Sequence, residues 1–405
     1  MHRFFLACFS QICPETHQSP TLMRYALTNG TIYSGYTTAQ GYAVLFEDGK
    51  ILDLVQTNEI PEGATLIDAQ GGIICPGFVD LQVNGGGGVY FTQYPTLESL
   101  NTIRDAHLQF GTTSFLPTVI SAFQDKILET IMAVREAMQQ QPSIFLGMHL
   151  EGPYFNPGKA GAHDPACIRE ATHEELDVLL EAGKDVITYL TLAPECVEES
   201  LLQRLVDSGI VLSAGHSLAT YDQAMHFFQN GVTAVTHLYN AMSGMDTKQP
   251  GLAAAALDYG QAWTGIIVDG EHCHPYAVRL AKKMLGEKLL LISDCAACVG
   301  SNIPFTDFGN FKAYYRNGRC ETEDGRLAGS ALTMLQAVQN TVNMVGLELD
   351  EAIRMATLYP AQVLKLEHKV GQLVPGAAAN LLVLDQELQL QNVWVDGTEI
   401  TLNQG

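Results

Sequence analysis

The sequence lacks long apolar runs and is poor in basic residues. None of its apolar stretches approaches the roughly 20 residues that a membrane-spanning helix needs. Only 22 Lys and Arg residues stand against 44 Asp and Glu residues, which gives a net charge of −22. Nucleic acids and acidic membrane surfaces attract clustered Lys and Arg, so we expect neither as a partner. One phosphate on a small molecule remains compatible with this charge, because a few local donors bind it.

Cysteines are few and scattered. Nine in 405 residues is an odd number, which argues against a disulfide framework and favours a soluble protein of the reducing cytoplasm. Cys295 and Cys298 form a CxxC pair, but no second CxxC exists to complete a zinc site. We expect them to be small buried side chains, with redox sensitivity as the alternative.

Several catalytic motifs are also missing. The chain contains no GxxxxGK[ST], no GxGxxG after a strand and no GxSxG, so nucleotide-dependent and serine-hydrolase mechanisms lack support. His173-Glu174 begins an HExxH pattern, but Asp177 stands where its second histidine belongs.

The two ends of the chain read as β structure. Residues 1–22 are expected to be a disordered tail or a start-site extension. Residues 23–74 and 371–405 hold short β-type runs between turns, including an Asp48-Gly49 step between two apolar runs that predicts a hairpin. We predict one small β-sandwich domain built from both segments.

Residues 75–370 read as a second, α/β domain. Eight apolar, β-prone runs alternate there with helical stretches, such as those at 101–110 and 201–208 that end before Gly111 and Gly209. Continuous apolar runs are typical of parallel strands buried on both faces, and eight of them predict a closed (β/α)₈ TIM barrel. The runs are Phe78–Val83, Thr113–Val119, Ile144–Leu150, Val186–Leu192, Ile210–Ala214, Ala234–Leu238, Thr264–Val268 and Leu289–Ser293.

Polar residues gather where these strands are expected to end. In a barrel the carboxyl ends of all strands face one pocket, so residues far apart in sequence converge. One such His is more often structural, but this many titratable groups at one topological position indicate a shared site. The residues are Gln82, Glu151, His216, His237, His272 and Asp294.

Glu151, His216 and His237 are the candidate metal ligands. A carboxylate with two imidazoles is a known catalytic zinc set that leaves one position open. Burying Glu151 without a partner would be costly, so we favour a ligand over a residue that caps the Gly152-Pro153 turn. Asp294 is the candidate proton shuttle, and a helix N-cap is its alternative role.

Longer motifs carry a resemblance to a known family. Pro76–Asp80 resembles the start of an amidohydrolase barrel. The motifs His149–Pro153, Ala214–Ser217, Thr236–Met242 and Gly329–Met334 together resemble the N-acetylglucosamine-6-phosphate deacetylase family of the amidohydrolase superfamily. The similarity runs from Met23 almost to the C-terminus.

The resemblance implies hydrolysis of the acetamide of N-acetylglucosamine 6-phosphate, a small amino-sugar phosphate, to glucosamine 6-phosphate and acetate. It implies metal ligation by Glu151, His216 and His237, acid–base catalysis by Asp294, and polarisation of the amide carbonyl by His163. It also suggests a homodimer. The substrate-binding residues expected from it are Gln82, Ala162, Asn240, Ala241, Lys248, His272, Leu327, Ala328 and Gly329.

Two departures sharpen these expectations. Many amidohydrolases carry His-x-His after the first strand, whereas this chain has Gln82-Val83-Asn84. We therefore predict one divalent metal ion per subunit, with a water held by Gln82 at the second position. Zinc is the first expectation, with iron, manganese or cobalt as alternatives. Lys248 stands where the family usually has an Arg that reaches the phosphate. We expect the phosphorylated substrate still to be preferred, by a smaller margin, and a merely solvent-exposed Lys248 is the alternative.

Alternatives remain open at this point. Another amidohydrolase, a deaminase or cyclic amidase, would keep the barrel and the metal, but such enzymes typically keep the paired histidines. A non-catalytic scaffold would have lost ligands or the acid–base residue, and here all are present.

Overall fold

The computed structural model describes residues 23–308, 311–316 and 318–403, so the extension expected at residues 1–22 lies outside the described residues. Eight parallel strands form one sheet in chain order, as the apolar runs predicted. Val83 and Cys295 form an isolated parallel bridge that brings the two ends of this sheet together into a nearly closed barrel. The strands are β8 (Phe78–Val83), β11 (Thr112–Ile120), β12 (Met148–Glu151), β13 (Ile187–Leu192), β14 (Val211–Ala214), β15 (Ala234–Val235), β16 (Trp263–Ile266) and β17 (Leu289–Leu291).

Helices surround the barrel, and four of them begin at a threonine N-cap. Thr96, Thr172, Thr220 and Thr333 each accept a hydrogen bond from a backbone N–H in the first turn of the following helix. The helices are α1 (Leu97–Leu108), α2 (Gln124–Gln140), α3 (His173–Gly183), α4 (Glu199–Asp207), α5 (Tyr221–Gln229), α6 (Leu252–Tyr259), α7 (Pro275–Leu285), α8 (Met334–Asn340), α9 (Leu349–Ala356) and α10 (Leu358–Val363).

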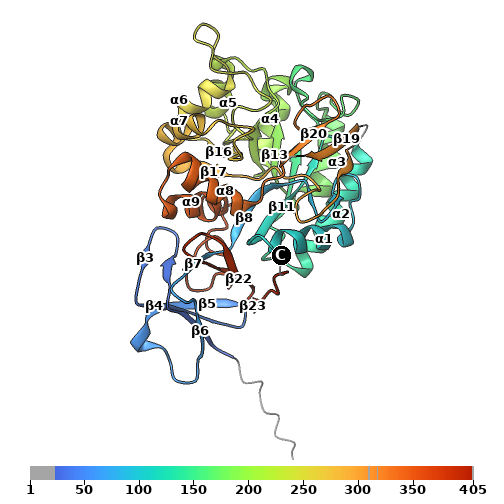
Figure 1. The fold of residues 1–405 in the computed structure, drawn as a ribbon. Helices are drawn as coiled ribbons and strands as arrows, with labels where there is room; N and C mark the ends of the chain where they lie inside the picture. The colour runs from blue at the N-terminus through green and yellow to red at the C-terminus, as the bar shows by residue number, and fades with distance from the viewer. Residues whose placement is uncertain (1–22, 309–310, 317, 404–405) are drawn as a thin grey trace, which may run out of the picture.

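Two further sheets lie below the barrel and combine both ends of the chain, blue and dark red in Figure 1. One has the strand order β5-β4-β1-β6 and the other β23-β22-β21-β7-β2-β3. Phe46 and Ile51 of the first sheet share a buried core with Ile74, Leu381 and Trp394 of the second, as a sandwich requires. The strands are β1 (Tyr25–Thr28), β2 (Thr31–Tyr33), β3 (Thr38–Ala39), β4 (Tyr42–Glu47), β5 (Lys50–Gln56), β6 (Thr65–Asp68), β7 (Ile73–Pro76), β21 (Leu381–Leu384), β22 (Leu390–Val395) and β23 (Thr398–Glu399).

The predicted hairpin is present between β4 and β5. Asp48 and Gly49 have φ of 48° and 73°, the left-handed conformation that this turn requires. Strand β7 then continues through a single residue, Gly77, into the first barrel strand. A Cβ at Gly77 would lie 2.0 Å from Oγ1 of Thr113, so only glycine fits at this junction.

Two elements were not predicted. A three-stranded antiparallel sheet, β18 (Phe305–Phe308), β19 (Phe311–Arg316) and β20 (Arg319–Thr322), is inserted between β17 and α8. The glycine run after the first barrel strand forms a small hairpin, β9 (Gly85–Gly86) with β10 (Val89–Tyr90). Gly87 and Gly88 donate backbone hydrogen bonds to Val299 and Ala297, so this run packs against the protein itself.

Within the described ranges, no helix combines the length and the apolarity that crossing a membrane would need.

Candidate metal centre

A cavity of about 310 Å³ opens at the carboxyl ends of the barrel strands. It collects side chains from loops that follow at least six different strands, as the barrel geometry predicted. Its lining comprises Asn84, Ile120, Glu151, Gly158, Lys159, Gly161, Ala162, His163, His216, His237, Asn240, Ala241, His272, Asp294, Leu327 and Gly329.

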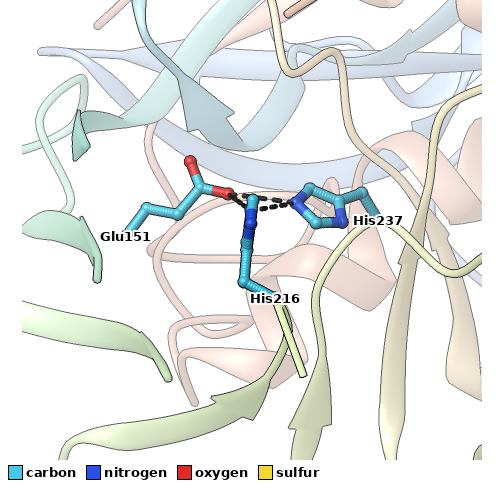
Figure 2. A group of neighbouring side chains, drawn as sticks. All are labelled: Glu151, His216 and His237. Atoms are coloured by element: carbon cyan, nitrogen blue, oxygen red, sulfur yellow. Dashed lines mark hydrogen bonds and ion pairs between the residues drawn. The ribbon is translucent and has the colours of Figure 1, made fainter. Parts of the chain in front are cut away.

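Glu151, His216 and His237 converge inside this cavity (Figure 2). Glu151 ends β12, and the two histidines follow β14 and β15. The Nε2 atoms of His216 and His237 are 3.1 Å apart, and they lie 3.4 and 3.1 Å from Oε1 of Glu151. All three side chains are buried.

These separations fit a divalent metal ion. Ligand bonds of about 2.1 Å arranged tetrahedrally place neighbouring ligand atoms about 3.4 Å apart. Nδ1 of His216 lies 2.8 Å from the carbonyl oxygen of Lys159. A carbonyl only accepts, so Nδ1 carries the proton and the lone pair of Nε2 faces the other two ligands.

The charge of Glu151 is favoured by its neighbours. Although burial alone raises the pKa of this carboxyl, the neighbouring imidazoles of His216 and His237 hold its pKa well below the usual range. The site therefore presents an ionised carboxylate beside two imidazole nitrogens, the donor set that binds zinc and similar ions.

Asp294 follows β17 and lines the same cavity as the three candidate ligands. Its Oδ1 accepts hydrogen bonds from Nε2 of Gln82 (2.9 Å) and from Nδ2 of Asn84 (2.8 Å). Burial and then the charge of Glu151 raise the pKa of Asp294 to about 7. No helix begins at the residues directly after Asp294, so the alternative role of a helix N-cap is not supported.

Gln82 connects the two carboxylates. The same Nε2 that contacts Asp294 also donates to Oε1 of Glu151 at 2.9 Å. Gln82 is buried and is not among the cavity-lining residues, so its contacts are with the two acids themselves.

His163 is held as a neutral hydrogen-bond donor. The backbone N–H of Ser121 donates to Nδ1 of His163 at 3.1 Å, which leaves the ring proton on Nε2. Burial, followed by the neighbouring imidazole of His216, lowers the pKa of His163 to about 3. A neutral imidazole at the cavity wall can polarise a carbonyl without adding a charge.

Several of these residues have strained backbones. His216, His237, Ala241 and Asp294 have φ of 49°, 34°, 48° and 50°, a region that residues with a Cβ rarely occupy. Such conformations concentrate at functional sites, where the surrounding structure enforces them.

The expected substrate-binding residues divide into two groups. Ala162, Asn240, Ala241, His272, Leu327 and Gly329 line the cavity. Gln82, Ala328 and Lys248 do not: Ala328 is fully buried against Cys298 and Cys320, and Lys248 lies in an exposed loop, where its backbone N–H contacts Asp246.

Sequence reasoning missed some lining residues. Lys159 lines the cavity, and Asn84 contacts Asp294. Lys159 lies four residues before His163 in one short motif, which was the available signal. The seven cysteines among the described residues are free thiols, and Cys295 and Cys298 are buried, as expected.

The sequence matches two known protein families and several curated relatives. Residues 24–74 match the NagA composite domain and residues 73–400 match the amidohydrolase family. The chain is 38% identical to an N-acetylglucosamine-6-phosphate deacetylase of Haemophilus influenzae over 93% of this chain and 99% of that protein. It is 37% identical to an N-acetylgalactosamine-6-phosphate deacetylase of a Shewanella species, over 80% of this chain and 82% of the relative.

Solved structures support the same assignment. The crystal structure of N-acetylglucosamine-6-phosphate deacetylase from Pasteurella multocida superposes with a TM-score of 0.91 at 36% identity, over 94% of this chain and 100% of that one. The fold, the family match and the convergent acid and imidazole groups agree: the chain belongs to the amidohydrolase family.

Proposed function

We propose that this protein hydrolyses the acetamide of N-acetylglucosamine 6-phosphate to glucosamine 6-phosphate and acetate. The observation that carries the proposal is the convergence of Glu151, His216 and His237 with Asp294 and the neutral His163 in one cavity. The activities named for the relatives above support the choice of substrate.

The proposed cofactor is one divalent ion per subunit, with zinc first and iron, manganese or cobalt as alternatives. Such an ion, held by Glu151, His216 and His237, would supply Lewis-acid chemistry that activates water near neutral pH. The position of Gln82 supports a single ion. A second metal ion there would need an imidazole or carboxylate ligand, whereas the amide of Gln82 donates hydrogen bonds to Glu151 and Asp294.

The residues of the chain account for the remaining steps. Asp294 accepts the proton of the attacking water and returns it to the amine nitrogen as the C–N bond breaks. The Nε2–H of His163 donates to the acetamide oxygen, where negative charge develops. The products are acetate and the free amine.

We propose that the phosphate end is recognised by Lys159 and His272. Both residues line the cavity, together with Asn240 and Ala241. Lys248 is exposed in its own chain. We propose that the protein is a cytoplasmic homodimer in which Lys248 approaches the partner's cavity, and a relaxed need for the 6-phosphate remains the alternative.

A second candidate substrate is N-acetylgalactosamine 6-phosphate. The 37% identical Shewanella relative carries that name, and the two sugars differ only at C4. Both sugar phosphates carry the acetamide at C2 and the phosphate at C6, so the residues of the cavity suit either substrate.

The test is acetate release from both sugar phosphates, from unphosphorylated N-acetylglucosamine and from a cyclic amide. Asp294→Asn is the control, expected to lose activity while retaining metal. Elemental analysis of the same preparation should give one equivalent of metal per chain. Cyclic-amide hydrolysis without acetate release would contradict the proposal, and two metal equivalents would contradict the one-ion site.

A further inference from the structure

A series of buried hydrogen bonds connects residues of the strands and segments that bear the candidate metal ligands. Nε2 of His149 lies 2.7 Å from Oγ1 of Thr191, and this oxygen lies 2.7 Å from Oγ1 of Thr236. The hydroxyl of Ser213 follows at 2.6 Å from Thr236, and the phenol of Tyr189 donates to Ser213 at 2.9 Å. All five side chains are buried.

The carbonyl of Leu81 fixes which group donates and which accepts in each of these hydrogen bonds. Nδ1 of His149 lies 3.0 Å from the carbonyl oxygen of Leu81, which only accepts, so Nδ1 carries a proton. Burial favours the neutral ring, so Nε2 accepts from Thr191. Each hydroxyl has one proton, so Thr236 must then donate to Thr191, and Ser213 to Thr236.

These hydrogen bonds involve every segment that bears a candidate metal ligand. His149 and Glu151 are two residues apart on β12 and therefore point to the same side of the strand. Strand β13, which bears no ligand, contributes Thr191 and Tyr189 and links the other three segments. The pairs of chain member and ligand are His149 with Glu151, Ser213 with His216, and Thr236 with His237.

We infer that His149, Thr191, Thr236, Ser213 and Tyr189 are positioning residues that set the spacing of the three metal ligands. The inference rests on the proposed metal site. Any relative shift of β12, β14 or β15 would leave a buried donor or acceptor unpaired, which is costly. The hydrogen-bond chain therefore fixes the strands on which ligand spacing depends, and a metal site needs its ligands held within a few tenths of an ångström.

The test compares Thr191→Val, which removes the hydroxyl with little change of shape, with Thr191→Ser, which keeps it. Thr264→Val is the matched control, because Thr264 is also a buried barrel threonine but donates only to the carbonyl of Ala262 in its own segment. The measurement is the Zn²⁺ dissociation constant of each metal-free protein, by competition with a chromogenic chelator.

We expect Thr191→Val to bind Zn²⁺ about 10- to 100-fold more weakly than the wild type, the usual loss when support behind a ligand is removed. Thr191→Ser should restore most of the affinity, and Thr264→Val should keep it. Thermal unfolding of the metal-free proteins checks that the two valine variants are folded.

Ser213→Ala provides a second variant if Thr191→Val does not fold, and we expect it to weaken binding about tenfold. Wild-type affinity in the folded variant tested, or an equal loss in Thr264→Val, would overturn the inference. A wild-type protein that binds no Zn²⁺ would instead overturn the proposed metal site, so the two failures are distinguishable.

Discussion

At the scale of single residues, the surroundings of Asp294 suit its proposed role as a proton shuttle. Its carboxyl is half-buried in the cavity with Glu151 and is hydrogen-bonded by two side-chain amides. Those amides hold it in place, while burial keeps its proton affinity high. A proton shuttle needs both properties, because it must accept a proton and then release it within one turnover.

The pH dependence of kcat/KM follows from this carboxyl. Asp294 must be ionised to accept a proton, so activity should be lost as the pH falls through its pKa. Burial and Glu151 raise that pKa to about 7 without metal, and a bound dication would lower it. The acid limb of the profile should therefore have its midpoint below pH 7. Activity that increases on acidification below that midpoint would contradict the assignment of Asp294 as base.

Lys159 is the residue that we expect to recognise the phosphate. Lys159→Ala should lower the ratio of kcat/KM for N-acetylglucosamine 6-phosphate to that for N-acetylglucosamine by about 10-fold or more, because a charged hydrogen bond is lost. Acetate release from both sugars measures the ratio. Lys248→Ala in the same assay tests the proposed contribution from the partner, and an unchanged ratio would remove Lys248 from the site.

At the scale of elements, three helices are joined by one cluster of charges. Glu351 of α9 contacts Lys282 of α7, Arg354 of α9 and the hydroxyl of Tyr359 of α10. Burial alone would raise the pKa of Glu351, but Lys282 and then Arg354 hold it below its usual value. The cluster therefore links α7 to α9 on the outside of the barrel.

Glu351→Gln should destabilise the protein by about 2 kcal/mol, because the mostly buried Lys282 loses its counter-charge and Arg354 keeps only Asp350. The pKa is lowered on folding, so the carboxylate stabilises the fold above its unfolded value of 4.5 and this stability is lost as the pH falls below it. Denaturant unfolding at pH 7 and at pH 4 measures both effects. The difference between variant and wild type should shrink at pH 4, and a constant difference would contradict this explanation.

Most elements were predictable because buried parallel strands leave continuous apolar runs. The exceptions have local causes. The run at 234–238 forms a strand of only two residues, because the chain turns into a left-handed conformation at His237. The run at 144–150 is interrupted at Gly147, whose φ is 131°, and β12 begins one residue later. The β18–β20 insertion has no such run, and its antiparallel pairing was not visible in the sequence.

The candidate site was predictable for residues at a strand end or within three residues of it, and unpredictable for residues further along the loops. Glu151, His216, His237 and Asp294 meet because barrel topology forces them together. Lys159 reaches the cavity through a loop whose path the sequence does not specify. The assigned catalytic and binding roles stay predictions that the experiments above address.

At the scale of the whole molecule, the small sheets and the barrel share one continuous stretch of chain. Strand β7 lies inside the six-stranded sheet, between β21 and β2, and runs through Gly77 into β8. We propose residues 23–74 with 371–405 as one domain and 75–370 as another. Strand β7 reaches Pro76, so the sheet extends two residues beyond the proposed boundary.

A chain truncated after residue 376 should therefore fail to fold. It lacks β21 to β23, which leaves β7 without a neighbour on one side and exposes the apolar core around Ile74. Soluble yield and circular dichroism measure the outcome, with a chain ending at residue 402 as control. Native spectra and Zn²⁺ binding in the shorter chain would show instead that the barrel is independent of the small sheets.

The left-handed backbone of His216, His237 and Asp294 has a consequence for engineering. A left-handed backbone at a residue with a Cβ costs folding free energy, whereas a glycine adopts it freely. The protein is therefore less stable at the positions of its reactive groups. Selection for heat resistance alone would therefore favour substitutions that relax these turns and abolish activity. Directed evolution of this enzyme should couple every thermal screen to turnover.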